Sequence, residues 1–161
     1  MNATDRIWTW QTYTAHVLQS LPADGPGRAP LVLHARLVGE LGELAEATES
    51  PARVLEAGDV LFFVAALEQV YGLTLSAVEP SYVGEAPRFS SAAVANAFTG
   101  AARIGQMLAK NVEHKEPIDL NLIHLWLYGV RHWTLCVVAS TTPAEVMAEN
   151  ARKLDAKWGR V

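Results

Sequence analysis

Apolar residues recur along most of the chain with the three- and four-residue spacing of an α-helix, and no stretch keeps the alternation of a half-buried strand. Proline residues interrupt this spacing at intervals. The pattern predicts about six helices in a single all-α domain. Because the connections between them are mostly short, we expect neighbouring helices to pack antiparallel in a bundle. We expect these helices over residues 4–20, 31–48, 51–71, 91–113, 119–140 and 143–158.

Several predicted helices carry recognisable end signals. Ser50 is expected to be the N-cap of the third helix, which should close near Gly72. Asp119 is a suitable cap for the fifth helix, and Thr142 and Glu145 form a capping box with an intervening proline at the start of the sixth. The remaining segments are predicted to be a loop over 22–30, a short helical turn at 75–80 and a connector over 80–90.

Composition narrows the class of protein. The 161 residues suit one domain, half of them are apolar, and 19% are charged, which is a globular composition. The single cysteine, Cys136, excludes a disulfide within the chain. The longest apolar run, Val60 to Leu67, is far shorter than the roughly 20 residues of a membrane span. With a net charge of −4 and no visible signal peptide, we expect a soluble, cytoplasmic protein that binds neither membranes nor nucleic acid.

Four carboxylates have a spacing that suits a metal site. Glu40 and Glu43 lie three residues apart on one predicted helix, and Glu56 and Asp59 repeat this spacing on the next. A short link makes the two helices an antiparallel hairpin, so the four side chains can converge. Their mutual repulsion requires a cation, and a set of oxygen ligands favours Mg²⁺ or Mn²⁺.

Acidic residues at helical spacing are also common on solvated surfaces. We assign Glu46 and Glu49 to such a surface. The four carboxylates differ because the third helix is strongly apolar. Glycines 39, 42 and 58 are poor helix formers and suggest that the helices approach one another closely there.

These motifs resemble a known family. The two acidic pairs, the second within Gly58-Asp59-Val60-Leu61-Phe62-Phe63, look like the MazG-like branch of the all-α nucleoside triphosphate pyrophosphohydrolases. The beginning, Trp10-Gln11-x-x-Thr14-Ala15, and the end, Asn150-x-x-Lys153-Leu154, are similar to the first and closing helices of that family. Lys157 stands where the family usually has arginine.

The resemblance implies Mg²⁺-dependent hydrolysis of a nucleoside or deoxynucleoside triphosphate to the monophosphate and pyrophosphate, as in house-cleaning of the nucleotide pool. Mn²⁺ could replace Mg²⁺. The metal ligands would be Glu40, Glu43, Glu56 and Asp59. Either Glu40 or Glu43 would also act as the general base, and the sequence does not choose between them.

The resemblance also implies substrate contacts. Asn150 and Lys153 would contact the triphosphate, with Lys110 as a weaker candidate. Trp10 and Phe63, together with Trp8 and Phe62, could form the walls of a base pocket. Aromatic residues in such positions are more often ordinary core, and a lysine taken alone is more often an ordinary surface residue.

The chain can be aligned with itself as a tandem repeat, with one copy over about 1–80 and a second over about 90–158. The glycines and apolar positions match, but the four carboxylates become Arg103, Gln106, Leu127 and Val130. The charge is also divided, because residues 1–80 hold ten acidic and four basic residues, and residues 81–161 hold seven and nine. Helical periodicity alone can produce such an alignment. If the repeat is real, the chain is a fused pseudo-dimer with one live site, either monomeric or pairing again as a homodimer.

Two alternative functions have sequence requirements of their own. A catalytically inactive nucleotide- or partner-binding helical module would keep the fold without turnover. A di-metal oxidase would use Glu-x-x-His pairs, and no histidine of this chain lies three residues after a glutamate.

Overall fold

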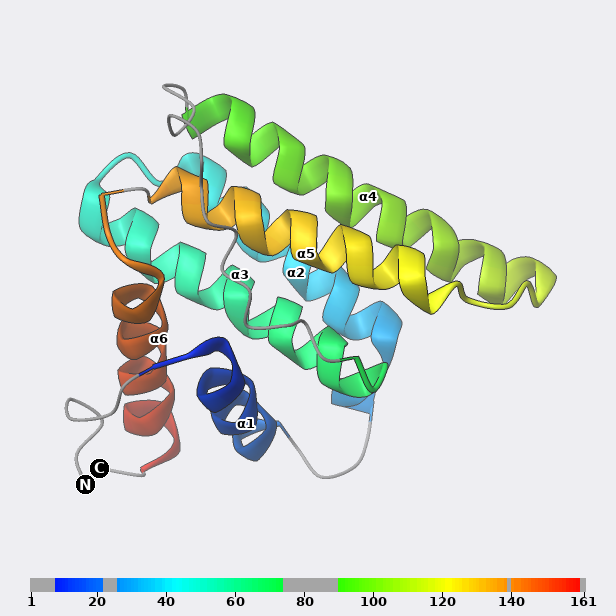
Figure 1. Cartoon of the computed structure of the whole chain (residues 1–161), viewed down its shortest axis with the longest axis horizontal. Coiled ribbons are helices and arrows are strands. Elements are labelled where there is room, and N and C mark those ends of the chain that lie inside the picture. The colour runs from blue at the N-terminus through cyan, green and yellow to red at the C-terminus, as the bar shows by residue number, and fades with distance from the viewer. Residues whose placement is uncertain (1–7, 22–25, 74–89, 139, 160–161) are drawn as a thin grey trace.

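The computed structural model describes residues 8–21, 26–73, 90–138 and 140–159. These residues form six α-helices and one short 3-10 helix and contain no strand, so the all-α prediction is confirmed (Figure 1). In chain order the elements are α1 (Trp10–Ser20), η2 (Pro26–Arg28), α2 (Pro30–Glu46), α3 (Ser50–Val70), α4 (Ser90–His114), α5 (Leu120–Val137) and α6 (Pro143–Trp158). No helix among them has an apolar stretch long enough to cross a membrane.

Most helix ends fall within two residues of the predictions, and three differences have a clear local cause or are larger. The helix α1 begins at Trp10 and not at residue 4, because Thr9 is extended and its side chain caps the backbone of Thr12. In α3 the N-cap is Glu49, so Ser50 is already helical and the prediction that it caps was wrong; the backbone of Glu49 accepts the first helical hydrogen bond. The helix α5 ends at Val137, three residues before the predicted end.

The remaining end signals act as expected. Asp119 accepts hydrogen bonds from two backbone N–H groups at the start of α5. Thr142 and Glu145 form the capping box of α6, whose bounds match the prediction. Gly72, which follows the C-cap residue Tyr71 of α3, has φ of 63°, a conformation that favours glycine. The predicted turn at 75–80 lies outside the described residues, as does the predicted connector except for Ser90, which begins α4.

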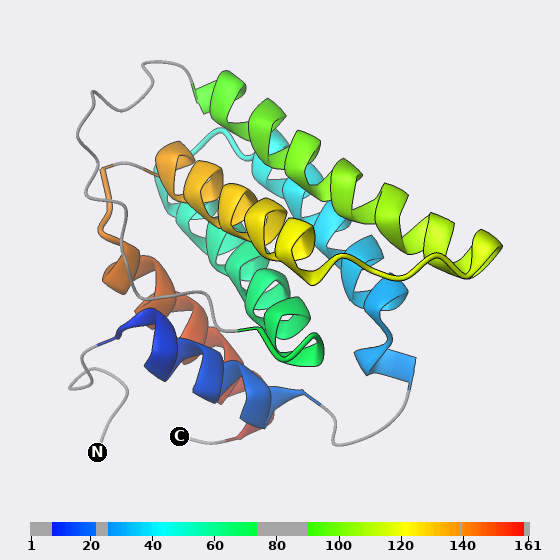
Figure 2. The ribbon, with the colours of Figure 1, turned by 45° about the vertical axis from the view of Figure 1, so that its right-hand side comes forward.

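Four helices form a bundle and two others cover one side of it. The helices α2 and α3 make one antiparallel hairpin and α4 and α5 a second, and α2 packs on α4 while α3 packs on α5 (Figure 1). The helices α1 and α6 lie side by side against α3, as the turned view shows (Figure 2). The helix α3 therefore contacts four neighbours, which explains why it is apolar on nearly all sides.

A buried polar group joins α1, α3 and α5. The indole N–H of Trp10 donates to Glu68 at 2.8 Å. The guanidinium of Arg131 lies 4.7 Å from the centre of the Trp10 ring. Glu68 and Arg131 are only 2% and 5% exposed. Trp10 thus belongs to the packing of three helices.

The arrangement of the two hairpins bears on the predicted repeat. Each helix of the first hairpin packs on the helix that the alignment assigns as its counterpart. The aligned glycines, however, differ in surroundings: a Cβ on Gly105 would meet His34 at 2.7 Å, whereas one on Gly42 would meet nothing within 4 Å. The repeat therefore stays a prediction.

Candidate metal and substrate site

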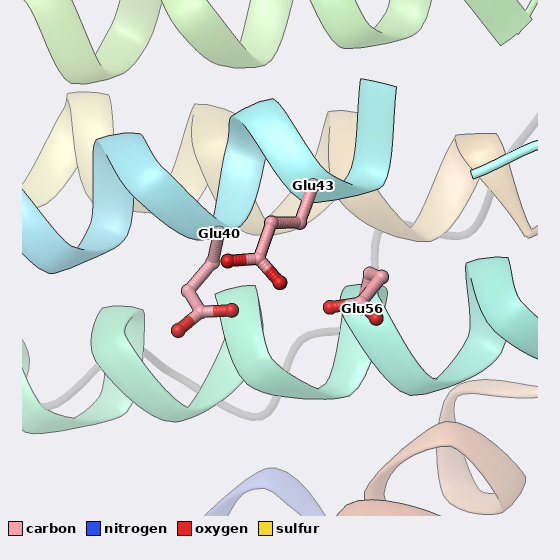
Figure 3. Close-up of side chains that lie close together, drawn as sticks. All are labelled: Glu40, Glu43 and Glu56. Carbon is pink, nitrogen blue, oxygen red and sulfur yellow. The ribbon is translucent and has the colours of Figure 1, made fainter. Parts of the chain in front are cut away.

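Three of the four predicted carboxylates converge between α2 and α3. Each of Glu40, Glu43 and Glu56 offers an oxygen, and these oxygens all lie within 4.8 Å of one another (Figure 3). The three-residue spacing puts Glu40 and Glu43 on the same face of α2, and the short link over 47–49 turns α3 back along that face. We call these three residues the carboxylate triad.

Asp59 lies one turn further along α3 and is engaged by α6. Its Oδ1 accepts a hydrogen bond of 2.8 Å from the side-chain amide of Asn150. Its Oδ2 forms an ion pair with the ammonium of Lys153. Of the four carboxylates predicted to converge, three do so, and the charge of the fourth, Asp59, is balanced by Lys153.

The electrostatics reflect this crowding of negative charge. Burial, followed by the charges of Asp59, Glu43 and Glu56, raises the pKa of Glu40 to about 7. Burial and the charge of Asp59 also raise the pKa of Glu56. Burial alone would lower the pKa of Lys153, but its hydrogen bond with Asp59 and the nearby carboxylates raise it overall. Without a metal, the site thus favours added positive charge.

A tyrosine that was not among the predicted site residues holds Asn150, the hydrogen-bond partner of Asp59. The hydroxyl of Tyr13 is fully buried and donates to Oδ1 of Asn150 at 2.7 Å. This bond orients the amide so that its nitrogen faces Asp59. Tyr13 and Asn150 are separated by 137 positions in sequence, so no local pattern links them, and Tyr13 is indistinguishable there from a core residue of α1.

One glycine permits this contact. A Cβ on Gly58 would lie 2.8 Å from Cβ of Asn150, so α6 packs directly against the backbone of α3. The predicted close approach at Gly58 is confirmed. The same prediction for Gly39 and Gly42 was wrong, because a Cβ at either would meet nothing within 4 Å.

The fold brings only part of the predicted substrate-binding set to the triad. Asn150 and Lys153 reach it through Asp59. Trp10 is held by Glu68 in the core, and Trp8 is 5% exposed. Phe63 is 7% exposed, and its ring packs edge-on against Phe62 with 5.0 Å between centres. These burials favour core packing for the aromatic residues, and their proposed role as pocket walls stays a prediction.

Lys110 lies away from the triad. The ring of His34 on α2 donates to the carbonyl of Ala101 on α4, and the two helices are antiparallel (Figure 1). From this contact, Lys110 and Glu40 lie in opposite directions. At a rise of 1.5 Å per residue the separation along the axes is about 20 Å. Lys110 is exposed on α4.

A concavity lies at the end of the bundle where α2, α4 and α5 meet. It encloses about 470 Å³ and is mostly apolar, with Arg53 as its one charged residue. The Nε of Arg53 already donates to the carbonyl of Ala47. None of the predicted site residues lines this concavity, so it does not extend the triad.

The residues of the triad fit a hard divalent cation. All three donors are carboxylate oxygens, the ligand type that Mg²⁺ and Mn²⁺ take, and they are supplied by two packed helices. Asp59 is near enough to influence the pKa of Glu40 and Glu56. No family model, curated protein or solved structure matches this chain.

Proposed function

We propose that the protein hydrolyses a nucleoside or deoxynucleoside triphosphate to the monophosphate and pyrophosphate with Mg²⁺ as cofactor. The observation that carries this proposal is the carboxylate triad of Glu40, Glu43 and Glu56. Asp59 lies one turn of α3 beyond Glu56, and it is contacted by a lysine and an amide of α6. The resemblance of these motifs to the MazG-like pyrophosphohydrolases supports the choice of reaction.

In this proposal some residues bind the cation and the substrate, and one also accepts a proton. Glu40, Glu43 and Glu56 would hold the cation, with Asp59 as the fourth ligand. Bound Mg²⁺ would neutralise charge on the phosphates and lower the pKa of a water molecule. Glu40 or Glu43 would take the proton from the attacking water. Lys153 would supply positive charge to the triphosphate, as a flexible ammonium does.

A direct assay tests the proposal. Purified protein with Mg²⁺ should release pyrophosphate, not orthophosphate, from at least one member of a panel of the common NTPs and dNTPs. The panel should include dUTP and oxidised or methylated bases, because house-cleaning would show as a preference for the non-standard nucleotides.

The matched variants are Glu43→Ala and Glu46→Ala. Both residues are exposed glutamates on α2, but only Glu43 belongs to the triad. Loss of a metal ligand should lower turnover by about 100-fold or more, while Glu46→Ala should keep it. Equal activity of the two variants would contradict the assignment. Mg²⁺-dependent nucleotide binding without any pyrophosphate release would favour the inactive binding module instead.

A further inference from the structure

We propose that Asp59 exchanges partners at one of its two oxygens: Lys153 neutralises Oδ2 until a divalent cation binds at the triad, and cation binding then releases the ammonium. This inference rests on the proposed function, because it takes the cation site from it. It adds that Lys153 is a resident counter-ion as well as a candidate phosphate contact.

The first oxygen of Asp59 is fixed. Oδ1 accepts the amide hydrogen bond of Asn150, which is 1% exposed. The amide is itself held by the buried hydroxyl of Tyr13, and the absent side chain of Gly58 lets Asn150 come this close. We call Tyr13 and Asn150 the clamp. Because the clamp holds one oxygen, the carboxylate keeps its orientation when the other oxygen changes partner.

The second oxygen has a partner that can leave. The side chain of Lys153 is 47% exposed, whereas that of Asp59 is 16% exposed. A long ammonium side chain at that exposure can move into solvent at small cost, since ion pairs with one solvated partner contribute little net free energy. We therefore take the buried amide of Asn150 as the permanent partner of Asp59 and the half-exposed ammonium of Lys153 as the exchangeable one.

Lys153 and a divalent cation would compete for the same carboxylates. The ammonium of Lys153 interacts with Asp59, Glu56 and Glu40, so it already occupies part of the field that a cation would use. A divalent cation on these carboxylates satisfies the same negative charge and repels the ammonium. The freed ammonium stays on α6 beside the site, where an anionic triphosphate would attract it.

Reactivity of lysine side chains tests the exchange without any turnover. The full chain, freed of metal with a chelator, is treated briefly with an acylating reagent with and without saturating Mn²⁺ at matched ionic strength. Peptide mass spectrometry then gives the modification rate of each lysine. We expect Mn²⁺ to raise the rate at Lys153 by about threefold or more, because an ion-paired ammonium is protected. Lys115 and Lys157, both exposed, serve as internal controls and should not change.

Binding of Mn²⁺ is measured separately by titration calorimetry or electron paramagnetic resonance. If the unmodified chain binds no Mn²⁺, both the cation site of the proposed function and the exchange are overturned. If Mn²⁺ binds but the rate at Lys153 is unchanged or falls, the exchange is overturned and the proposed function stands.

The clamp has its own pair of variants. Tyr13→Phe removes the hydroxyl that orients Asn150, and Tyr71→Phe removes a buried hydroxyl that has no hydrogen-bond partner among the described residues. The orienting partner of Asp59 is Asn150, and loss of such a partner typically weakens metal binding about tenfold or more. Tyr13→Phe frees the amide of Asn150 and should therefore weaken Mn²⁺ binding by up to about tenfold. Tyr71→Phe should leave it unchanged. Equal Mn²⁺ affinity in the two folded variants, checked by circular dichroism, would overturn the clamp.

Discussion

Sequence spacing predicts some contacts between residues of the site and not others. The spacing of Glu40, Glu43 and Glu56 is local to one helical hairpin, so their meeting could be predicted from 17 consecutive positions. The partners of Asp59 could not, because Asn150 lies 91 positions away. The resemblance of the closing segment to the family pointed to Asn150 and Lys153, yet it assigned them to the substrate and not to Asp59.

The raised pKa of Glu40 makes a prediction about stability. A carboxyl group whose pKa is about 7 in the folded chain and about 4.5 when unfolded binds its proton more tightly when folded. The free energy of unfolding should therefore fall as pH rises from about 4.5 to about 7 and stay low above that range.

Glu40→Gln should remove the fall in unfolding free energy between about pH 4.5 and pH 7, because glutamine does not ionise. In chelator, the variant should melt about 2–4 °C above the unmodified chain at pH 8, since solvent screening leaves about 1 kcal/mol of the effect. At pH 5 the two should melt together. Glu46→Gln, at an exposed position of α2, is the control and should shift neither melting temperature. A stabilisation by Glu40→Gln that is equal at both pH values would contradict this origin.

The charge of Lys153 leads to opposite changes in binding and turnover. Lys153→Met removes a cation that competes for the carboxylates, so Mn²⁺ should bind about tenfold more tightly. Turnover of the triphosphate should fall because the substrate loses an ammonium contact. Lys157→Met, four residues further along α6, should change neither quantity. If Lys153→Met weakens Mn²⁺ binding, the lysine does not compete with the cation.

At the scale of elements, helix identity could be predicted and helix contacts could not. The end signals at Asp119 and Thr142 act through hydrogen bonds within three residues, so they hold in the structure. Glycine content was a poorer guide. It indicates a weak helix former, but which neighbour approaches it depends on how distant helices pack, and only Gly58 of the three selected positions meets another helix.

Gly58 and Gly39 give a matched pair for this point. Gly58→Ala places a Cβ against Cβ of Asn150, and neither main chain can yield without separating α3 from α6. The variant should lose about 2–3 kcal/mol of unfolding free energy. Gly39→Ala meets open space within an exposed helical position and should gain about 0.5–1 kcal/mol. Chemical denaturation measures both, and similar effects from the two substitutions would contradict the close packing at Gly58.

At the scale of the whole molecule, α3 unites the core and the site. It carries Glu56 and Asp59 on its first half and the buried Glu68 near its end, and it contacts α1, α2, α5 and α6. Its apolar sequence predicted burial on most sides. It did not predict which helices would cover it, because a helix that is apolar all round gives no preferred direction for its partners.

The central position of α3 predicts the order in which the molecule opens. Backbone amides of Val60–Leu67 should be the slowest to exchange with deuterium, since their side chains are almost all fully buried and opening them disrupts four helix contacts. The end of α4 and the start of α5 should exchange much faster, because Val112, Leu120 and Leu125 are about half exposed there. Mass spectrometry of the exchanged chain measures both regions at once. Faster exchange in the middle of α3 than at the α4–α5 end would mean that the two hairpins separate before they fray. That order would place the weakest interface of the described residues between the α2–α3 hairpin and the α4–α5 hairpin.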